Sequence, residues 1–160
     1  MARRYDPPLT EPGTRARARI VVECRRSIAG RRALDAVAEL ARERGARITV
    51  VATVPPSNEP ARCCGSLGGS VWSDLMQSEA RDELEEAADL LHECADVGFV
   101  LAPGARVPVL VETAQRVEAD AIIVAGRPPR VLQRSAPCAV LRAGQPPVRR
   151  RKARMLRRVT

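Results

Sequence analysis

The chain has 160 residues, of which 45% are hydrophobic but only 2% are aromatic. This length suits a single domain, whose core must consist of aliphatic side chains. No apolar run approaches the ~18 residues that a membrane-spanning helix needs. The basic N-terminus is not followed by the apolar segment of a secretory signal. We therefore expect a cytoplasmic protein.

The net charge of +8 is concentrated at the two ends of the sequence. Residues 145–160 contain seven basic residues and no acidic one, and residues 1–19 carry a net charge of +3. The segment between them is mildly acidic, so the overall basicity says little about the folded surface. Proline pairs without hydrophobic periodicity predict a disordered arm over 1–18. We predict a folded domain over 19–144 and a disordered basic tail over 145–160.

The first half of the folded segment has the pattern of a strand, a helix and a strand. Residues 19–24 (RIVVEC) are rich in β-branched side chains and predict a strand. Ser27 is suited to begin a helix as its N-cap, and Gly45 is suited to end it. Residues 47–54 (RITVVATV) predict the second strand. Three such elements within ~35 residues indicate a right-handed unit with parallel strands.

A loop and a second helix are predicted next. Residues 57–69 include three glycines and two cysteines, which predicts a mobile loop. A helix is expected from Ser73 or Ser78 to Ala95, with alanines and leucines turned inward. Its outer face carries five acids: Glu79, Asp82, Glu83, Glu86 and Asp89.

The remaining elements complete a sheet. Residues 97–102 predict a short third strand, which we expect at a sheet edge. Helical spacing after Gly104 predicts a third helix, and the apolar run 121–125 is typical of a strand buried on both faces. After at most a turn or two of helix, residues 137–142 predict the fifth strand. This alternation predicts a doubly wound α/β fold, flavodoxin-like or Rossmann-like, with five parallel strands in the order 3-2-1-4-5.

The loop after the fourth strand lies where an open α/β sheet holds its ligand, beyond the carboxyl ends of the strands. Nucleotide-binding proteins place glycine-rich loops there, whose backbone N–H groups bind a phosphate. Here Gly126 is followed by Arg127, Pro128, Pro129 and Arg130. Two prolines remove two donors and fix φ, so the segment cannot surround an anion with its own amides. The sequence predicts a site position without the usual phosphate chemistry.

Over roughly residues 19–143 the chain resembles the universal stress protein family. Three segments carry the resemblance: IVVECRRSIAGRRALDAVAELARERGARITVVATVPP, ETAQRVEADAIIVAG and SAPCAVLR. Members that bind ATP have an acid at the end of the first strand, and Gly-x-x-Gly, about nine residues and Gly-Ser/Thr after the fourth. At the first place this chain has Arg25, and at the second the glycine spacer and Gly-Ser are absent. The resemblance therefore implies the fold and a homodimer, but not ATP binding.

Four arginines are expected near the carboxyl ends of the first and fourth strands: Arg25, Arg26, Arg127 and Arg130. Guanidinium groups bind phosphate bidentately without help from glycines, so one interpretation is a pocket for a phosphorylated or other anionic ligand. The other interpretation is a set of solvated loop arginines in an arginine-rich chain.

The five cysteines are an odd number spread over strand, loop and helix, which favours free thiols in a reducing compartment. Cys24 and Cys138 are expected in strands, as small core residues. If Cys63 and Cys64 are exposed, redox sensing is one interpretation and incidental thiols are the other.

No catalytic or metal-binding constellation is found in the sequence. His92 and Cys94 lie two apart on a predicted helix, so they face in different directions and do not indicate a metal site. His92 is also the only histidine, and Asp120 begins a strand rather than ending one. We therefore predict neither an enzyme nor a cofactor or metal site.

These observations favour a stress-response or regulatory binding module with a universal stress protein fold that does not bind ATP. One alternative is a degenerate binder of adenine nucleotides or other anions. Another is a nucleic-acid or membrane-associated module that acts through the basic tail, residues 145–160. The strand at 137–142 is expected to leave an open sheet edge, and pairing of this edge with its copy predicts a homodimer.

Overall fold

The computed structural model describes residues 17–55 and 65–143. Its strands are β1 (Arg19–Glu23), β2 (Arg47–Val54), β3 (Val97–Pro103), β4 (Ala121–Val124) and β5 (Ala139–Arg142). Its helices are α1 (Ile28–Arg44), α3 (Gly65–Leu90), α4 (Arg106–Arg116) and α5 (Arg130–Ser135). Most of the predicted arm, the Cys63 and Cys64 pair and the predicted tail lie outside the described residues. None of the helices in the described ranges is long and apolar enough to cross a membrane.

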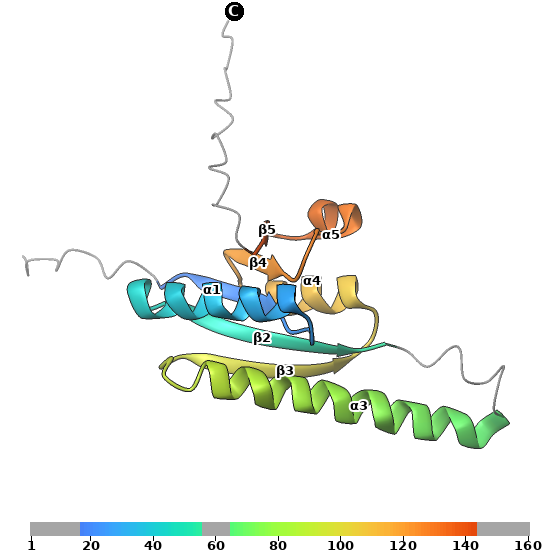
Figure 1. Cartoon of the computed structure of the whole chain (residues 1–160). Coiled ribbons are helices and arrows are strands. Elements are labelled where there is room, and N and C mark those ends of the chain that lie inside the picture. The colour runs from blue at the N-terminus through green and yellow to red at the C-terminus, as the bar shows by residue number, and fades with distance from the viewer. Residues whose placement is uncertain (1–16, 56–64, 144–160) are drawn as a thin grey trace, which may run out of the picture.

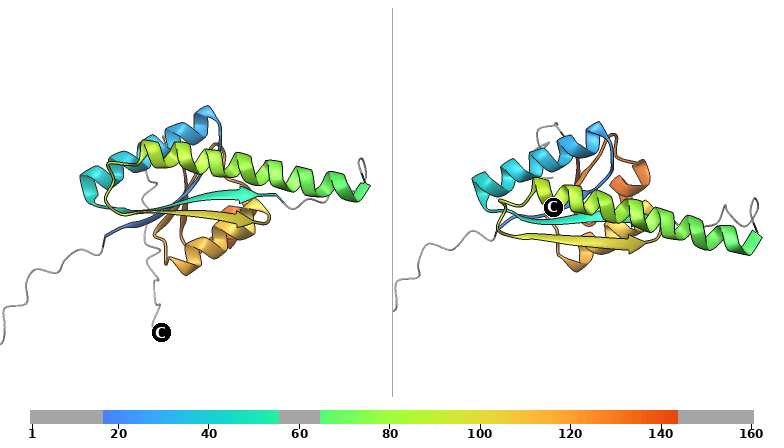
Figure 2. Two further views of the ribbon diagram at one scale, coloured as in Figure 1. Left: turned by 90° about the horizontal axis from the view of Figure 1, so that it is seen from below. Right: turned by 60° about the horizontal axis from the view of Figure 1, so that its bottom comes forward.

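The five strands form one parallel sheet in the order β3-β2-β1-β4-β5, which confirms the predicted topology. β1 lies at the centre, where Val22 pairs with Val50 of β2 and with Ile123 of β4. Helices α1 and α3 cover one face of the sheet, whereas α4 and α5 cover the other (Figure 1, Figure 2). The fold is therefore a doubly wound α/β sandwich of three layers.

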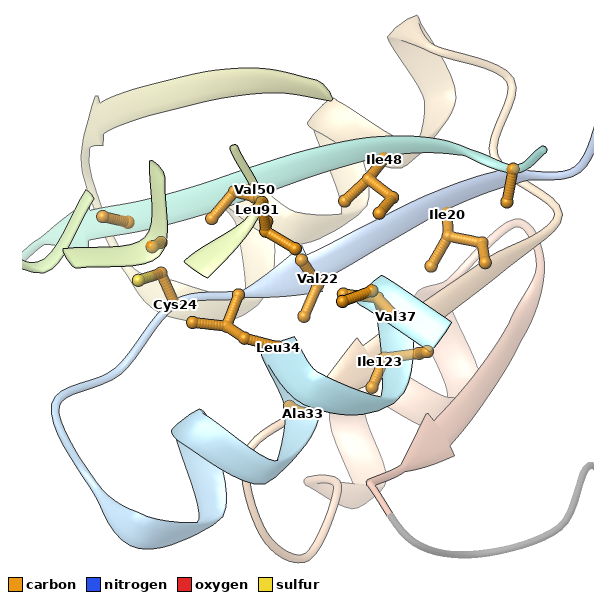
Figure 3. Close-up of a cluster of buried hydrophobic side chains, with 14 of the residues drawn as sticks. Ile20, Val22, Cys24, Ala33, Leu34, Val37, Ile48, Val50, Leu91 and Ile123 are labelled. Carbon is orange, nitrogen blue, oxygen red and sulfur yellow. The ribbon is translucent and has the colours of Figure 1, made fainter. Parts of the chain in front are cut away.

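Alternate residues of the central strands point into two aliphatic clusters, one on each face of the sheet. On the first face, Val22 packs with Leu34 and Val37 of α1 (Figure 3). On the second face, Val21 packs with Leu110 of α4. Because neighbouring residues of β1 are both fully buried, this strand is covered on both faces, as a continuous apolar run predicts.

Both predicted caps of α1 are present. The Ser27 hydroxyl accepts a hydrogen bond from the Gly30 N–H at 3.0 Å. At the other end Gly45 has a left-handed φ of 63°, and its N–H donates to the Ala41 carbonyl at 2.9 Å. The first turn packs closely on the preceding loop, since a Cβ atom on Gly30 would overlap the Arg25 carbonyl oxygen.

The predicted start of the second helix was wrong. We expected it at Ser73 or Ser78, but α3 already begins at Gly65, inside the segment predicted as a loop. Glycines lower helix propensity by ~1 kcal/mol each without removing a backbone donor, so the hydrogen-bonded ladder continues through them. As a result, the N-terminal part of α3 projects beyond the carboxyl ends of β2 and β3 (Figure 1, Figure 2).

The predicted end of the same helix, at Ala95, was also wrong. The helix stops at Leu90 and a turn follows, in which the Cys94 N–H donates to the Leu91 carbonyl at 2.9 Å. The chain turns here because it must reach the start of β3, which pairs in parallel with β2.

The two edges of the sheet differ in charge. The prediction that the third strand is an edge is confirmed, and β3 has no charged side chain from Val97 to Pro103. On this edge Phe99 is 42% exposed. The opposite edge, β5, is two residues shorter than predicted at its start and ends at the exposed Arg142.

Candidate functional site

A buried carboxylate, that of Glu23, lies at the carboxyl end of β1. Only 3% of the Glu23 side chain is exposed. Its Oε2 atom accepts hydrogen bonds from the Ala125 backbone N–H at 3.2 Å and from Arg106 Nη2 at 2.6 Å. Arg106 Nε forms an ion pair with Oε1 of the same carboxylate, but no hydrogen bond. A single side chain thus joins β1, the end of β4 and the first residue of α4.

The loop after β4 begins at Ala125, next to this ion pair. Because β1 and β4 are parallel neighbours, their carboxyl ends meet at the edge where open α/β sheets bind ligands. Gly126 adopts a φ of 91°, which favours glycine, and Arg127 is exposed. Pro128 and Pro129 follow and lack an N–H, and the first residue of α5 is Arg130. The first donor past β4, the Ala125 N–H, is therefore bound to Glu23, and the loop adds few others.

A cavity of about 300 Å³ opens beside the ion pair, between the ends of β1 and β2 and the helix α3. Its charged walls are the carboxylates of Glu23, Glu79 and Glu83 and the guanidinium groups of Arg25 and Arg106. The buried pair neutralises one charge of each sign. The remaining walls hold two carboxylates against one arginine, which does not favour a polyanion.

A second cavity, of about 500 Å³, separates the start of α1 from α3. Charged groups of the chain pair with one another across it. Arg26 Nη2 donates to Glu86 Oε1 at 2.5 Å, and this hydrogen bond raises the pKa of the guanidinium. The Arg26 backbone N–H donates to Glu83 Oε1 at 3.1 Å. Burial nevertheless raises the pKa of Glu83, because its partial removal from water outweighs these favourable contacts.

The structure does not gather the four predicted arginines into one pocket. Arg25 lines both cavities, whereas Arg26 is held by the carboxylates of α3. Arg127 and Arg130 are exposed and line neither of these two cavities. Arg106, which was not among the predicted arginines, also lies at the ends of the strands, where it is bound to the Glu23 carboxylate.

The described thiols and the histidine lie apart from one another. Cys24 is buried, as predicted, and its Sγ donates to the Glu83 carbonyl at 3.4 Å. Burial raises the pKa of this thiol to about 12, and nearby carboxylates add to the effect. Cys138 is partly buried just before β5 and packs on the α4 side of the sheet.

His92 lies after α3, with Nδ1 2.7 Å from the Asp89 carbonyl oxygen. Across residues 17–55 and 65–143, no three side chains gather as metal ligands.

Glu23 and Arg106 were not identified as site residues from the sequence. The resemblance directed attention to Arg25, two positions later, as the counterpart of the family's acid. One signal was available, because an acid inside a strand expected to be buried on both faces needs a partner. Its partner lies 83 positions away and could not be identified from spacing.

Solved structures with the same fold support this architecture. A universal stress protein family member from Burkholderia pseudomallei is 26% identical, with a TM-score of 0.62 over 81% of this chain and 97% of that one. UspA from Lactobacillus plantarum is 20% identical, with a TM-score of 0.63 over 79% and 97%. The universal stress protein from Archaeoglobus fulgidus in complex with dAMP is 22% identical, with a TM-score of 0.50 over 78% and 95%. No curated protein sequence matches the chain.

The family match covers most of the domain. The model of the universal stress protein family matches residues 17–136, from just before β1 to the residue after α5. This range contains four of the five strands and all of the described helices. The strand order and the matched residues together lead to one conclusion. The chain belongs to the universal stress protein family.

Proposed function

We propose that this chain is a regulatory binding module of the stress response that does not bind ATP. The observation that carries the proposal is the buried ion pair between Glu23 and Arg106. Together with the Ala125 N–H, it fills the junction between β1, β4 and α4 with groups that already bind one another, the Arg106 Nη2 and the Ala125 N–H both donating to Glu23. A triphosphate at this edge would meet few free amides and an excess of carboxylates.

Displacing the pair would be unfavourable. A phosphate that captured Arg106 would leave the Glu23 carboxylate buried without a charge partner, which costs about 3–5 kcal/mol for a buried pair. A penalty of this size weakens binding by roughly two to three and a half powers of ten in the dissociation constant. Nucleotide binding at micromolar affinity is therefore not expected at this edge.

Calorimetric melting curves of the full chain with ATP, ADP, AMP and cyclic AMP test the proposal. A ligand that binds only the native state must raise the melting temperature. We expect no shift with millimolar ATP and magnesium, whereas a saturable rise would contradict the proposal. The Arg106→Gln variant is measured beside wild type, because it removes the internal guanidinium without adding another positive charge.

The alternative of a small anionic ligand has a distinct signature in the same assay. Arg25 lines the 300 Å³ cavity, and one relative from Archaeoglobus fulgidus was solved with dAMP. Stabilisation by AMP that is lost in Arg25→Gln, with no response to ATP, would support this alternative. Equal flat curves for both nucleotides would exclude it.

We also propose a homodimer that forms through the outer edge of β5. Within the described residues β5 pairs only with β4. The Ala143 N–H donates to the Val124 carbonyl of β4. Neighbouring N–H groups of a strand face opposite sides, so the Arg142 N–H should face the open edge.

Arg142→Pro removes this donor, whereas Arg142→Ala keeps it. Light scattering should give twice the chain mass of 17.4 kDa for wild type and Arg142→Ala, and a weaker dimer for Arg142→Pro. A monomeric wild type would refute the dimer.

A further inference from the structure

The projecting part of α3 carries an exposed apolar patch, made of Val71, Trp72 and Leu75. Their exposed fractions are 68%, 44% and 48%. Further along the helix, Met76 and Ala80 pack against the sheet. The patch lies upstream of these contacts, in the N-terminal part of α3, and this part of the helix extends past the ends of β2 and β3 (Figure 2). This part of the helix is therefore without a covering element in the described structure.

The same helix is acidic beyond the patch. Asp82 lies two helical turns after Leu75, and Glu85 follows three residues later, so these exposed acids share an outer face with the patch. From residue 71 to residue 90 the helix has seven carboxylates and one arginine. Within the part of the chain that the structure describes, only one of these seven carboxylates, that of Glu86, forms an ion pair. The outer face of α3 thus combines an apolar end with a run of unpaired negative charge.

The tail of the chain has the complementary composition. Residues 149–154 contain five basic residues, and Met155 and Leu156 follow directly. No acid occurs from residue 145 to residue 160. A basic run followed by two apolar side chains matches an acidic run that ends in an apolar patch.

The topology places the start of the tail at the end of the sheet where α3 projects. All strands are parallel, so the carboxyl end of β5 lies on the same side of the sheet as the carboxyl ends of β2 and β3, beyond which α3 projects. Four strand spacings of ~4.8 Å separate β3 from β5, or about 19 Å. The six residue-to-residue steps from Ala143 to Arg149 span up to ~20 Å when extended, and the chain from Ala143 to Arg158 spans up to ~50 Å. The other basic segment, at the N-terminus, precedes β1 and therefore joins the sheet at the amino ends of the strands, on the opposite side.

We propose that residues 145–160 dock on the outer face of α3 in the same molecule. The basic run lies along the carboxylates, and Met155 and Leu156 cover Trp72 and Leu75. Docking neutralises both surfaces and shields the apolar patch from water. The docked tail cannot bind nucleic acids or anionic membranes, and salt releases it from α3 because it screens the charges.

Trp72 is the single tryptophan of the chain and lies in the patch, so its fluorescence reports on docking. Acrylamide quenching is measured on the full chain and on a tail variant, Arg149→Glu, Arg150→Glu and Arg151→Glu. Three N-terminal substitutions, Arg3→Glu, Arg4→Glu and Arg15→Glu, change the net charge equally and serve as the matched control. At about 50 mM NaCl we expect quenching of the tail variant to exceed that of wild type about two-fold, with no difference left at about 500 mM. The control should behave like wild type.

A charge-swap cycle tests whether the two surfaces meet. Asp82 is exposed and unpaired among the described residues, so Asp82→Arg should leave the fold intact. Asp82→Arg and Arg150→Asp should each increase quenching of Trp72, and the double variant should recover part of the protection. Additive single effects would show that these positions do not interact and would overturn the docking geometry.

Three further outcomes would overturn the proposal. Equal quenching of wild type and the tail variant at low salt would mean that the tail does not cover Trp72. Protection that grows with protein concentration between about 1 and 100 µM would assign the docked tail to a second copy. A short DNA duplex that binds wild type and Asp82→Arg with equal affinity would mark the tail as a free nucleic-acid contact.

Discussion

Glu23 at the end of β1 and Arg106 at the start of α4 form an ion pair between positions that are 83 residues apart. The Glu23 side chain is almost fully buried, whereas the Arg106 side chain remains 28% exposed. Because the carboxylate also accepts the Ala125 N–H, the pair links the central strand to the connection that follows β4. The same contact therefore stabilises the fold and occupies the edge at which related folds bind ligands.

Removing the charge of Glu23 should destabilise the fold strongly. Glu23→Gln leaves Arg106 without its partner, and we expect a loss of about 2–4 kcal/mol, near the range for breaking a buried pair. The matched control is Asp96→Asn, which breaks the exposed pair with Arg47 and should cost about 0.5 kcal/mol or less. Urea unfolding followed by far-ultraviolet circular dichroism gives both values. Equal losses would contradict the special role of the buried pair.

Gly30 should not tolerate a methyl group, although alanine is the better helix former. A Cβ atom there would overlap the Arg25 carbonyl oxygen, so Gly30→Ala should destabilise the protein by about 1–3 kcal/mol. At Gly98 a Cβ atom meets nothing within 4 Å, and Gly98→Ala should change stability by less than about 0.5 kcal/mol. The same denaturation measurement compares them, and a stabilising Gly30→Ala would refute the close approach.

Glu83 should make stability depend on pH in the opposite sense to a carboxylate whose pKa is lowered on folding. Burial raises its pKa in the folded state, so the folded protein holds the proton more tightly than the unfolded chain. Stability from this group is thus lost as the pH rises through the interval between the two pKa values. Glu83→Gln keeps the carbonyl oxygen that accepts the Arg26 N–H and should raise the melting temperature at pH 7 by roughly 1–2 °C, given its partial exposure.

The gain from Glu83→Gln should shrink at about pH 4, because more of the wild-type carboxyl is then protonated in the folded protein. Glu85→Gln removes the same charge from an exposed position on the same helix and serves as the control. Calorimetry at both pH values distinguishes them. A gain that persists at low pH would exclude proton binding as its cause.

Cys24 should resist alkylation in the native protein. With a pKa of about 12, only ~10⁻⁴ of the thiol is ionised at about pH 8, and the sulfur is also buried. Cys94 is partly exposed and should react much faster with iodoacetamide. Peptide mass spectrometry after brief labelling measures both residues, and labelling in urea is the positive control. Rapid native labelling of Cys24 would mean that the end of β1 opens readily.

The sheet could be predicted because its signals are local. The β-branched run at β1 and β2, the Ser27 cap and the Gly45 terminus each depend on a few neighbouring residues, and all are confirmed. The bounds of α3 were wrong because glycine only weakens a helix, while the turn after Leu90 is imposed by the position of β3. Local propensity thus identified the elements, and tertiary contacts decided where the second helix begins and ends.

The site was harder to predict because its groups come from distant parts of the sequence. The prolines at 128 and 129 directed attention to the loop after β4, since a missing N–H is a property of the residue itself. The partners of Glu23 are Arg106 and the Ala125 backbone, and only the folded sheet brings them together. The predicted arginine cluster does not form, because Arg26 pairs with a carboxylate of α3 instead.

The uncharged edge strand β3 has a consequence for handling the protein. A β5-mediated dimer would leave β3 open, with Phe99 on its surface and no lysine or arginine to repel another strand. Concentrated solutions should therefore lose material by strand addition along β3. Phe99→Lys would place a gatekeeper charge there and improve soluble yield without touching the crevice or the helix α3.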